Sequence, residues 1–380
     1  MSGTIYLDNN ATTRVAPECL DAVLACLRDE YGNPSSKHAA GDRARRLVNE
    51  ARAQVAELLG AQSAEIVFTS GGTESNHLAI LGVLARDPRR QHVVTSSVEH
   101  PSTLQLLRHL EGCGVRVTLL PVDAQGQLDP AAVEAAIAPD TALISFLWAN
   151  NETGVLFPVE QVARIACERN VLLHLDAVQV VGKLAVDLRQ LPADFLSLSG
   201  HKFHAPKGVG ALFVRKGVTL PPLLFGHQER ARRGGTENVP AIVGLGIAAA
   251  VAAETLETGM HTMMTLRARL EQGVCERAPF ATVNGGDAAR VANTSSIRFG
   301  NLIGEALAAR LDQAGVCVGL GAACTAGSSA PSHVLTAMGL DARAVLASMR
   351  FSLSRYTTGK EIERVLNLLP EVVRNQPAAA

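Results

Sequence analysis

Short apolar runs alternate with amphipathic segments along the chain from about residue 64 onward. Segments such as 101–112 and 159–170 carry apolar residues at helical spacing, which predicts helices there. The runs between such segments are rich in β-branched residues and predict strands at 64–70, 92–97, 115–122, 141–149, 171–177, 194–199 and 209–215. Several of these strands are apolar throughout, as is typical of a sheet covered on both faces. The pattern therefore predicts an α/β fold with a mostly parallel sheet.

The pattern changes after about residue 255. A long helix is predicted at 257–278, and fewer, more widely spaced strands follow it. A chain of 380 residues also exceeds what one hydrophobic core usually supports. We therefore expect a large domain over residues 14–255 and a smaller α+β domain formed by residues 1–13 and 256–380.

Charge and composition exclude some classes of partner. The 35 basic and 36 acidic side chains leave a formal net charge of -1, so no global field would attract nucleic acid or an anionic membrane. The N-terminus has no basic segment followed by an apolar run, and no uncharged stretch of about 18 apolar residues occurs. Seven cysteines without a C-x-x-C pair indicate a reducing compartment rather than disulfides or structural zinc. We expect a cytoplasmic protein with no nucleic-acid partner, no membrane partner and no metal.

The run "GGTES" directly follows the first of the predicted strands. Two glycines before a helix leave backbone N–H groups and the positive end of the helix dipole at the carboxyl end of a strand, which is typical of an anion site. Thr73 and Ser75 would add hydroxyl donors. A tight turn with Thr73 as a helix cap is the alternative, and for such a run alone it is the more common one.

Two charged residues lie at the ends of predicted strands. Asp176 ends one strand, and a buried carboxylate there needs a cationic partner unless it only caps a helix. Lys202 follows another strand beside His201, so its amine is expected in the crevice at the edge of the sheet. A lysine of lowered pKa can act there as a carbonyl nucleophile or a base, whereas the alternative is an ordinary solvated lysine. Lys207 fits the solvated description better.

The run "GLGIAA" at residues 244–249 matches a dinucleotide-binding pattern. It follows "ENVPAIV", which predicts the first turn of a helix and not the strand that such a site requires. Close helix packing is therefore the better explanation for its glycines.

Cys324 has different surroundings from the other cysteines. Cys19 and Cys26 lie seven residues apart on one face of a predicted helix and are expected in the core. Cys324 lies in the glycine-rich run "GLGAACTAGSSAPSH", just before a helix that would start at Pro331 or Ser332. An exposed thiol near a helix N-terminus favours a reactive thiolate.

Ten motifs of this sequence together resemble one family, the cysteine desulfurases, over nearly the full length and most closely in the NifS-like branch. The motifs are "YLDNNATT", "YGNPSS", "FTSGGTES", "VEHPS", "WANNETG", "HLDAVQ", "SGHKFHAPKGVG", "QERARRGGTENV", "ACTAGSSAPSH" and "RFSLSRYTT". The resemblance implies fold type I of the pyridoxal phosphate enzymes, the aspartate-aminotransferase-like fold. It also implies a homodimer whose cofactor sites lie between the domains and near the subunit boundary.

The resemblance implies a role toward pyridoxal phosphate for each matching residue. Lys202 would bind the aldehyde covalently, Asp176 would keep the ring nitrogen protonated, and His100 would stack on the ring and shuttle protons. Two residues would hydrogen-bond near the phenolate oxygen, namely Asn151 and Gln179. The phosphate would be held by Gly72, Thr73, Ser199 and His201. Thr236 would reach the phosphate from the second subunit.

Substrate residues follow from the same resemblance. Arg350 would clamp the carboxylate of L-cysteine, with help from Asn33. The Cys324 thiolate would attack the substrate sulfur, which leaves L-alanine and a persulfide on Cys324. The sulfur would pass to an acceptor or scaffold protein of iron–sulfur cluster assembly, nitrogenase clusters included. Phe225 and Ala231 stand where the family has glycines, but no predicted catalytic group is changed.

Other functions stay open at this point. A selenocysteine lyase is a close enzymatic alternative, and the rates on selenocysteine and cysteine would separate the two. A sulfur-relay protein without catalysis would lack Lys202, Asp176 or Arg350, all of which are present. A cysteine hydrolase built on Cys324 and His333 has only sequence proximity behind it.

Overall fold

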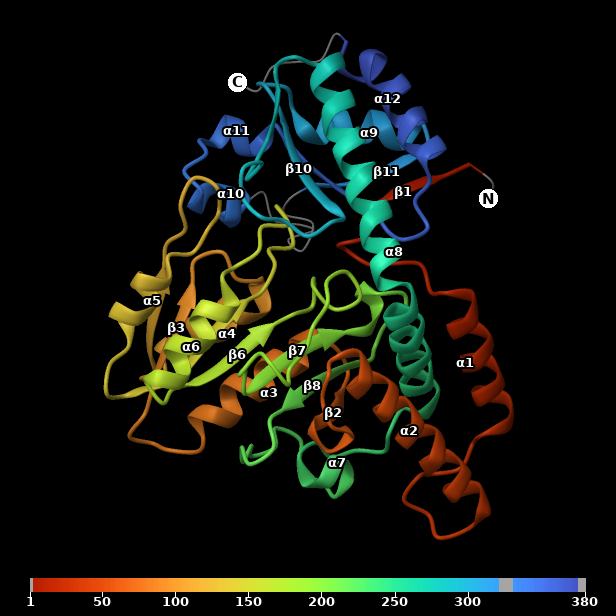
Figure 1. Cartoon of the computed structure of the whole chain (residues 1–380), viewed down its shortest axis with the longest axis vertical. Coiled ribbons are helices and arrows are strands. Elements are labelled where there is room, and N and C mark those ends of the chain that lie inside the picture. The colour runs from red at the N-terminus through yellow and green to blue at the C-terminus, as the bar shows by residue number, and fades with distance from the viewer. Residues whose placement is uncertain (1–2, 321–330, 375–380) are drawn as a thin grey trace.

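The computed structural model describes residues 3–320 and 331–374 (Figure 1). Its larger sheet has seven strands in the order β2-β8-β7-β6-β5-β3-β4. β8 pairs antiparallel with both of its neighbours, and the other pairs are parallel. The predicted α/β class with a mostly parallel sheet is therefore confirmed. The strands are β2 (Ile66–Thr69), β3 (His92–Ser96), β4 (Arg116–Leu120), β5 (Thr141–Leu147), β6 (Leu172–Asp176), β7 (Phe195–Ser199) and β8 (Gly210–Val214).

Helices cover both faces of this sheet, which explains why its central strands are apolar throughout. Successive residues of β5 enter opposite cores: Leu143 packs with α3 and α4 on one face, and Ile144 packs with α2, α6 and α8 on the other. Every residue of β5 is buried as a result. The helices before α8 are α1 (Pro17–Asp29), α2 (Ala39–Leu58), α3 (Gly72–Leu84), α4 (Pro101–Glu111), α5 (Pro130–Ala136), α6 (Val159–Glu168) and α7 (Gln228–Ala231).

A second, five-stranded sheet has the order β1-β11-β12-β10-β9. Its first strand comes from the N-terminus and pairs parallel with β11, whereas its other pairs are antiparallel. Residues near both ends of the chain therefore build one sheet. Its strands are β1 (Ile5–Leu7), β9 (Ala281–Val283), β10 (Thr294–Phe299), β11 (Val316–Leu320) and β12 (Ser348–Ser352), and its helices are α9 (Gly304–Gln313), α10 (His333–Ala337), α11 (Ala342–Leu346) and α12 (Gly359–Val373).

Helix α8 (Val239–Arg277) runs past both sheets (Figure 1). Its residues up to Ala252 belong to the core of the larger sheet, and its residues from Met263 onward belong to the core of the smaller one. The predicted helix at 257–278 is thus the second half of a longer helix, and the domain boundary near residue 255, which stays a prediction, falls inside it. By length and composition α8 could cross a membrane, but half of its most apolar stretch is buried within the protein.

Two further sequence predictions are confirmed by packing. Cys19 and Cys26 of α1 are buried, with 0% and 4% of their surface exposed. The "GLGIAA" run lies inside α8, where a Cβ on Gly246 would approach the Cα of Ala51 in α2 to 2.5 Å. The glycines of this run therefore serve helix contact, not a nucleotide.

Candidate active site

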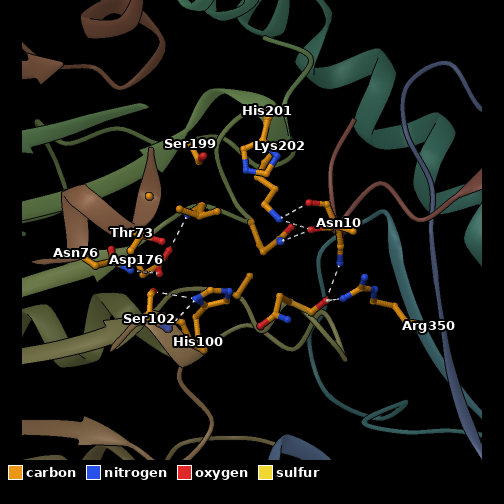
Figure 2. Close-up of a pocket in the computed structure, with 17 residues that line it drawn as sticks. Asn10, Thr73, Asn76, His100, Ser102, Asp176, Ser199, His201, Lys202 and Arg350 are labelled. Atoms are coloured by element: carbon orange, nitrogen blue, oxygen red, sulfur yellow. Dashed lines mark hydrogen bonds between the residues drawn. The ribbon is translucent and has the colours of Figure 1, made fainter. Parts of the chain in front are cut away.

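A cavity of about 330 Å³ lies at the carboxyl ends of the central strands of the larger sheet (Figure 2). This volume is at the lower end of the range for small-molecule sites, roughly 300–1,000 Å³. The cavity gathers side chains from α3, α4, β6, β7, β12 and the loop after β5. Ten of the residues assigned from the sequence line it: Gly72, Thr73, His100, Asn151, Asp176, Gln179, Ser199, His201, Lys202 and Arg350.

Two assigned residues, Asn33 and Thr236, do not line this cavity. Asn33 precedes α2, where its Oδ1 accepts the backbone N–H of Ser35 at 2.9 Å. Thr236 lies between α7 and α8 and is not among the residues that line the cavity of its own chain. Cys324 lies outside the described residues. The roles assigned to these residues stay predictions.

Lys202 ends a short 3-10 turn (Gly200–Lys202) that directly follows β7. Its Nζ points into the cavity and donates to the backbone carbonyls of Asn10 at 2.5 Å and Ala11 at 2.8 Å (Figure 2). Lys207, by contrast, is exposed. The prediction of a crevice lysine at position 202 is therefore confirmed.

Asp176 ends β6 and is 8% exposed. Its Oδ2 accepts the Nδ2–H of Asn76 at 2.7 Å, and its Oδ1 accepts the backbone N–H of Val178 at 3.0 Å. Both donors are neutral, so these contacts do not supply the cationic partner that the sequence predicts. A buried carboxylate held in this way would favour a protonated ring nitrogen as its partner.

His100 caps the N-terminus of α4 and lines the cavity. Its Nδ1 accepts the backbone N–H of Ser102 at 3.1 Å, so the proton of the neutral ring lies on Nε2. Burial lowers the pKa of His100, and the positive charge of Lys202 and the neighbouring His333 oppose the effect of Asp176. His100 can therefore donate from Nε2 near pH 7.

The start of α3 forms a cup with room for an anion. Gly71 has a φ of 155°, which favours glycine, and a Cβ on Gly72 would lie 2.7 Å from Cγ2 of Val178. The helix therefore begins beside the cavity with its first N–H groups at the lining residues Gly72 and Thr73. Ser75 was expected among the donors, but its hydroxyl hydrogen-bonds within the turn instead.

Arg350 lies on β12 with its guanidinium at the cavity. Its Nη2 donates to Oδ1 of Asp8 at 2.7 Å and its Nη1 to the carbonyl of Asn151 at 3.0 Å. Its Nε is buried and has no hydrogen-bond partner among the described residues. Nη1 and Nη2 carry two N–H groups each, so the guanidinium at the cavity keeps donors for a ligand carboxylate while Asp8 and Asn151 fix its position.

Asn10 is a site residue that the sequence analysis missed. Its backbone carbonyl accepts from Lys202 at 2.5 Å and from Gln179 at 3.0 Å, and its side chain donates to the carbonyl of Asn151 at 3.0 Å. One residue therefore holds three that line the cavity. The polar run "DNNATT" directly after a strand is the signal that could have drawn attention to it.

Two buried carboxyls behind the cavity were also missed. Glu99 accepts from Ser96 at 2.5 Å and from the backbone of Leu147 at 2.8 Å, and burial raises its pKa to about 8. Glu152 accepts from the hydroxyl of Ser332 at 2.5 Å, and burial raises its pKa to about 7. Ser332 caps α10, which confirms the predicted helix start. No group of three or more metal-ligating side chains occurs in the described part of the chain.

The sequence model of the protein family described as Aminotransferase class-V matches residues 5–365. The chain belongs to this family. Class-V relatives include a protein named cysteine desulfurase from Trichormus azollae, 49% identical over 97% of this chain and 92% of the relative. A protein named cysteine desulfurase NifS from Azotobacter vinelandii is 46% identical over the same shares. A solved structure titled NifS-like protein has a TM-score of 0.92 and 37% identity, covering 98% of this chain and 99% of the other. The resemblance and the predicted fold type I are confirmed.

Proposed function

We propose that this class-V protein is a pyridoxal phosphate-dependent cysteine desulfurase, which converts L-cysteine to L-alanine and a persulfide on Cys324. The observation that carries the proposal is the convergence of Lys202, Asp176, His100 and Arg350 on one cavity. The chain that brings these residues together is 49% identical, over nearly its full length, to a protein named cysteine desulfurase. A relay protein without catalysis would not need this set.

The residues of the cavity fit the cofactor. Pyridoxal phosphate, when bound, supplies an aldehyde that captures the substrate amine and a ring that accepts electrons from the α-carbon. Lys202 would hold the aldehyde covalently, and Asp176 would keep the ring nitrogen protonated. The residues that would hold the phosphate are Gly72, Thr73, Ser199 and His201, and those near the phenolic oxygen are Asn151 and Gln179.

The substrate carboxylate would bind the donors that Arg350 retains. The amine of Lys202, when it is not bound to the cofactor, would move the α-proton of the substrate. His100 would donate or accept a proton at Nε2. The Cys324 thiolate would then attack the substrate sulfur. A sulfur–sulfur bond would form on Cys324 as the carbon–sulfur bond of L-cysteine breaks, and the carbon skeleton, which keeps the electron pair of that bond, would take up a proton and leave as alanine.

Mass spectrometry after incubation with L-cysteine tests the proposal. We expect one extra sulfur on the peptide that contains Cys324 and, after borohydride reduction, the cofactor mass on the peptide that contains Lys202. Cys324→Ala should remove sulfide release and retain the yellow cofactor, whereas the control Cys317→Ala on β11 should behave as wild type. Sulfide release that survives Cys324→Ala would overturn the persulfide step, and a colourless wild-type protein would overturn the cofactor assignment.

We further propose that the enzyme acts as a cytoplasmic homodimer and passes sulfur to an acceptor protein of iron–sulfur cluster assembly. The position of Thr236 outside the cavity of its own chain supports a contribution from a second subunit. The described cysteines are free thiols, which supports a reducing compartment. The name NifS of one relative supports nitrogenase clusters as a destination of the sulfur. Light scattering on the purified protein tests the dimer, and transfer of labelled sulfur to a purified scaffold protein tests the acceptor.

A further inference from the structure

Lys183 is a buried lysine behind the cavity wall, with 5% of its surface exposed. It lies one helical turn after Gln179, and its Nζ donates to Oε1 of Gln179 at 2.7 Å and to Oδ1 of Asn10 at 3.3 Å. Burial and the cations Lys202 and Arg350 hold its pKa well below its usual range, and no carboxylate among the described residues offsets them. A buried amine without a counter-ion costs stability. Any stabilisation that Lys183 gives to the fold therefore comes from these two hydrogen bonds.

These contacts fix which way the amide of Gln179 points. Its Oε1 accepts from Lys183, and its Nε2 donates to the backbone carbonyl of Asn10 at 3.0 Å. A flipped amide would turn its oxygen against the backbone carbonyl of Asn10, which is repulsive, and would remove the oxygen to which Lys183 donates. The observed orientation leaves the second N–H of Gln179 for a ligand in the cavity that Gln179 lines.

We propose that Lys183 is a positioning residue: it makes Gln179 present an N–H donor, not a carbonyl oxygen, to the phenolic oxygen of pyridoxal phosphate. This inference rests on the proposed cofactor site. Without Lys183 only the carbonyl of Asn10 opposes the turned amide, and a turned amide would place its oxygen against an anionic oxygen. The donor stabilises the phenolate, whose negative charge grows when the bound cofactor loses its proton. Loss of the donor should therefore raise the pH at which the cofactor deprotonates.

The test is a spectroscopic pH titration of the holoenzyme. Lys183→Met removes the donors, and Lys183→Gln keeps an N–H donor without the charge. A hydrogen bond to a charged group corresponds to about 1–2 pKa units, so the midpoint of the absorption change should rise by about 1–2 pH units in Lys183→Met. It should rise much less in Lys183→Gln. Lys207→Met, which removes an exposed lysine, serves as the control and should titrate as wild type.

Other titratable or charged groups stay unchanged in these variants. Those that line the cavity are His100, Asp176, His201, Lys202 and Arg350. An absorption midpoint of Lys183→Met equal to that of wild type would overturn the inference. Equal midpoint shifts in Lys183→Met and Lys183→Gln would also overturn it, because they would show that the lost charge, and not the orientation of Gln179, causes the shift. If Lys183→Met does not fold, Lys183→Leu replaces it with the same outcomes. A wild-type protein that binds no cofactor would overturn the proposed function instead.

Discussion

Arg350 is a buried cation whose position depends on two neighbours that differ in kind. Asp8 supplies a carboxylate to Nη2 at 2.7 Å, which offsets part of the cost of burying the guanidinium. Gly319 supplies space, because a Cβ there would lie 2.6 Å from Oδ1 of Asp8 and 2.8 Å from Nη2 of Arg350. The position of Arg350 therefore depends on the absence of a side chain at Gly319 as well as on the carboxylate of Asp8.

Gly319→Ala should weaken substrate binding more than it slows turnover. The added Cβ would displace the Asp8–Arg350 pair, and a lost hydrogen bond between charged groups costs about 1.5–3 kcal/mol. At about 1.4 kcal/mol per tenfold, KM for L-cysteine should rise roughly tenfold to a hundredfold. kcat should change less, because the carboxylate is held equally before and during the reaction. Steady-state kinetics measures both constants.

The control for this prediction is Gly259→Ala in α8. A Cβ there would lie 3.6 Å from the nearest atom, an ordinary contact, so the kinetics should stay as in wild type. An unchanged KM in Gly319→Ala would contradict the role of Arg350 in binding the carboxylate.

Ala231 should be replaceable by glycine with a gain in stability. It is the last of three consecutive residues with positive φ, and its own φ is 61°. A side chain in this left-handed conformation costs roughly 1 kcal/mol relative to glycine. Ala231→Gly should therefore raise the free energy of unfolding by about 0.5–1 kcal/mol, measured by urea titration. Ala253→Gly, at an exposed position inside α8, should have the opposite effect, and a loss of stability in Ala231→Gly would contradict the argument.

At the scale of elements, the start of α10 is held by a buried carboxyl that lies next in the chain to a residue of the cavity lining. Ser332 caps the helix and donates to Oε2 of Glu152 at 2.5 Å. Glu152 directly follows Asn151, whose carbonyl binds Arg350. Because Glu152 is buried, it keeps its proton at a pH at which an exposed glutamate has lost it.

This buried carboxyl predicts a pH dependence of stability. Burial raises the pKa of Glu152 from 4.5 to about 7, so its contribution is fully present below pH 4.5 and is lost as the pH rises through 7. The shift corresponds to about 2–3 kcal/mol between pH 5 and 8. Glu152→Gln lacks this titration and can still accept from Ser332. The melting temperature of Glu152→Gln minus that of wild type should therefore increase as the pH rises from 5 to 8. A difference in melting temperature that stays constant across this range would contradict the prediction.

The sequence predicts these elements better than it predicts their contacts. Strand ends such as Asp176, and the start of α3 after Gly71, follow from local patterns and lie where predicted. Asn10, Lys183 and Asp8 were missed because their roles depend on partners far away in the sequence. No local pattern shows that residue 8 pairs with residue 350, or that residue 10 accepts from residue 202.

At the scale of the whole molecule, the site depends on β1 joining the sheet built by the C-terminal part of the chain. Ile5 pairs with Val316, and the segment after β1 then crosses to the larger sheet, where Asn10 accepts from Lys202. The cavity is therefore formed between the two sheets and requires both. Thr236 and Asn33 do not line it in a single chain, and for Thr236 the proposed second subunit is where we expect its predicted role.

Mixed dimers should reveal whether Thr236 serves the other subunit. Lys202→Ala removes the amine, and Thr236→Asp places a carboxylate where a phosphate donor is predicted, so each variant alone should be inactive. In a hybrid of the two, one site combines both changes, but the other combines an intact Lys202 with an intact Thr236 of the opposite chain. Co-expression with two affinity tags isolates this hybrid, and sulfide release should return from one of its two sites. An inactive hybrid would mean that Thr236 acts within its own chain, and an active Thr236→Asp parent would mean that it does not contact the phosphate at all.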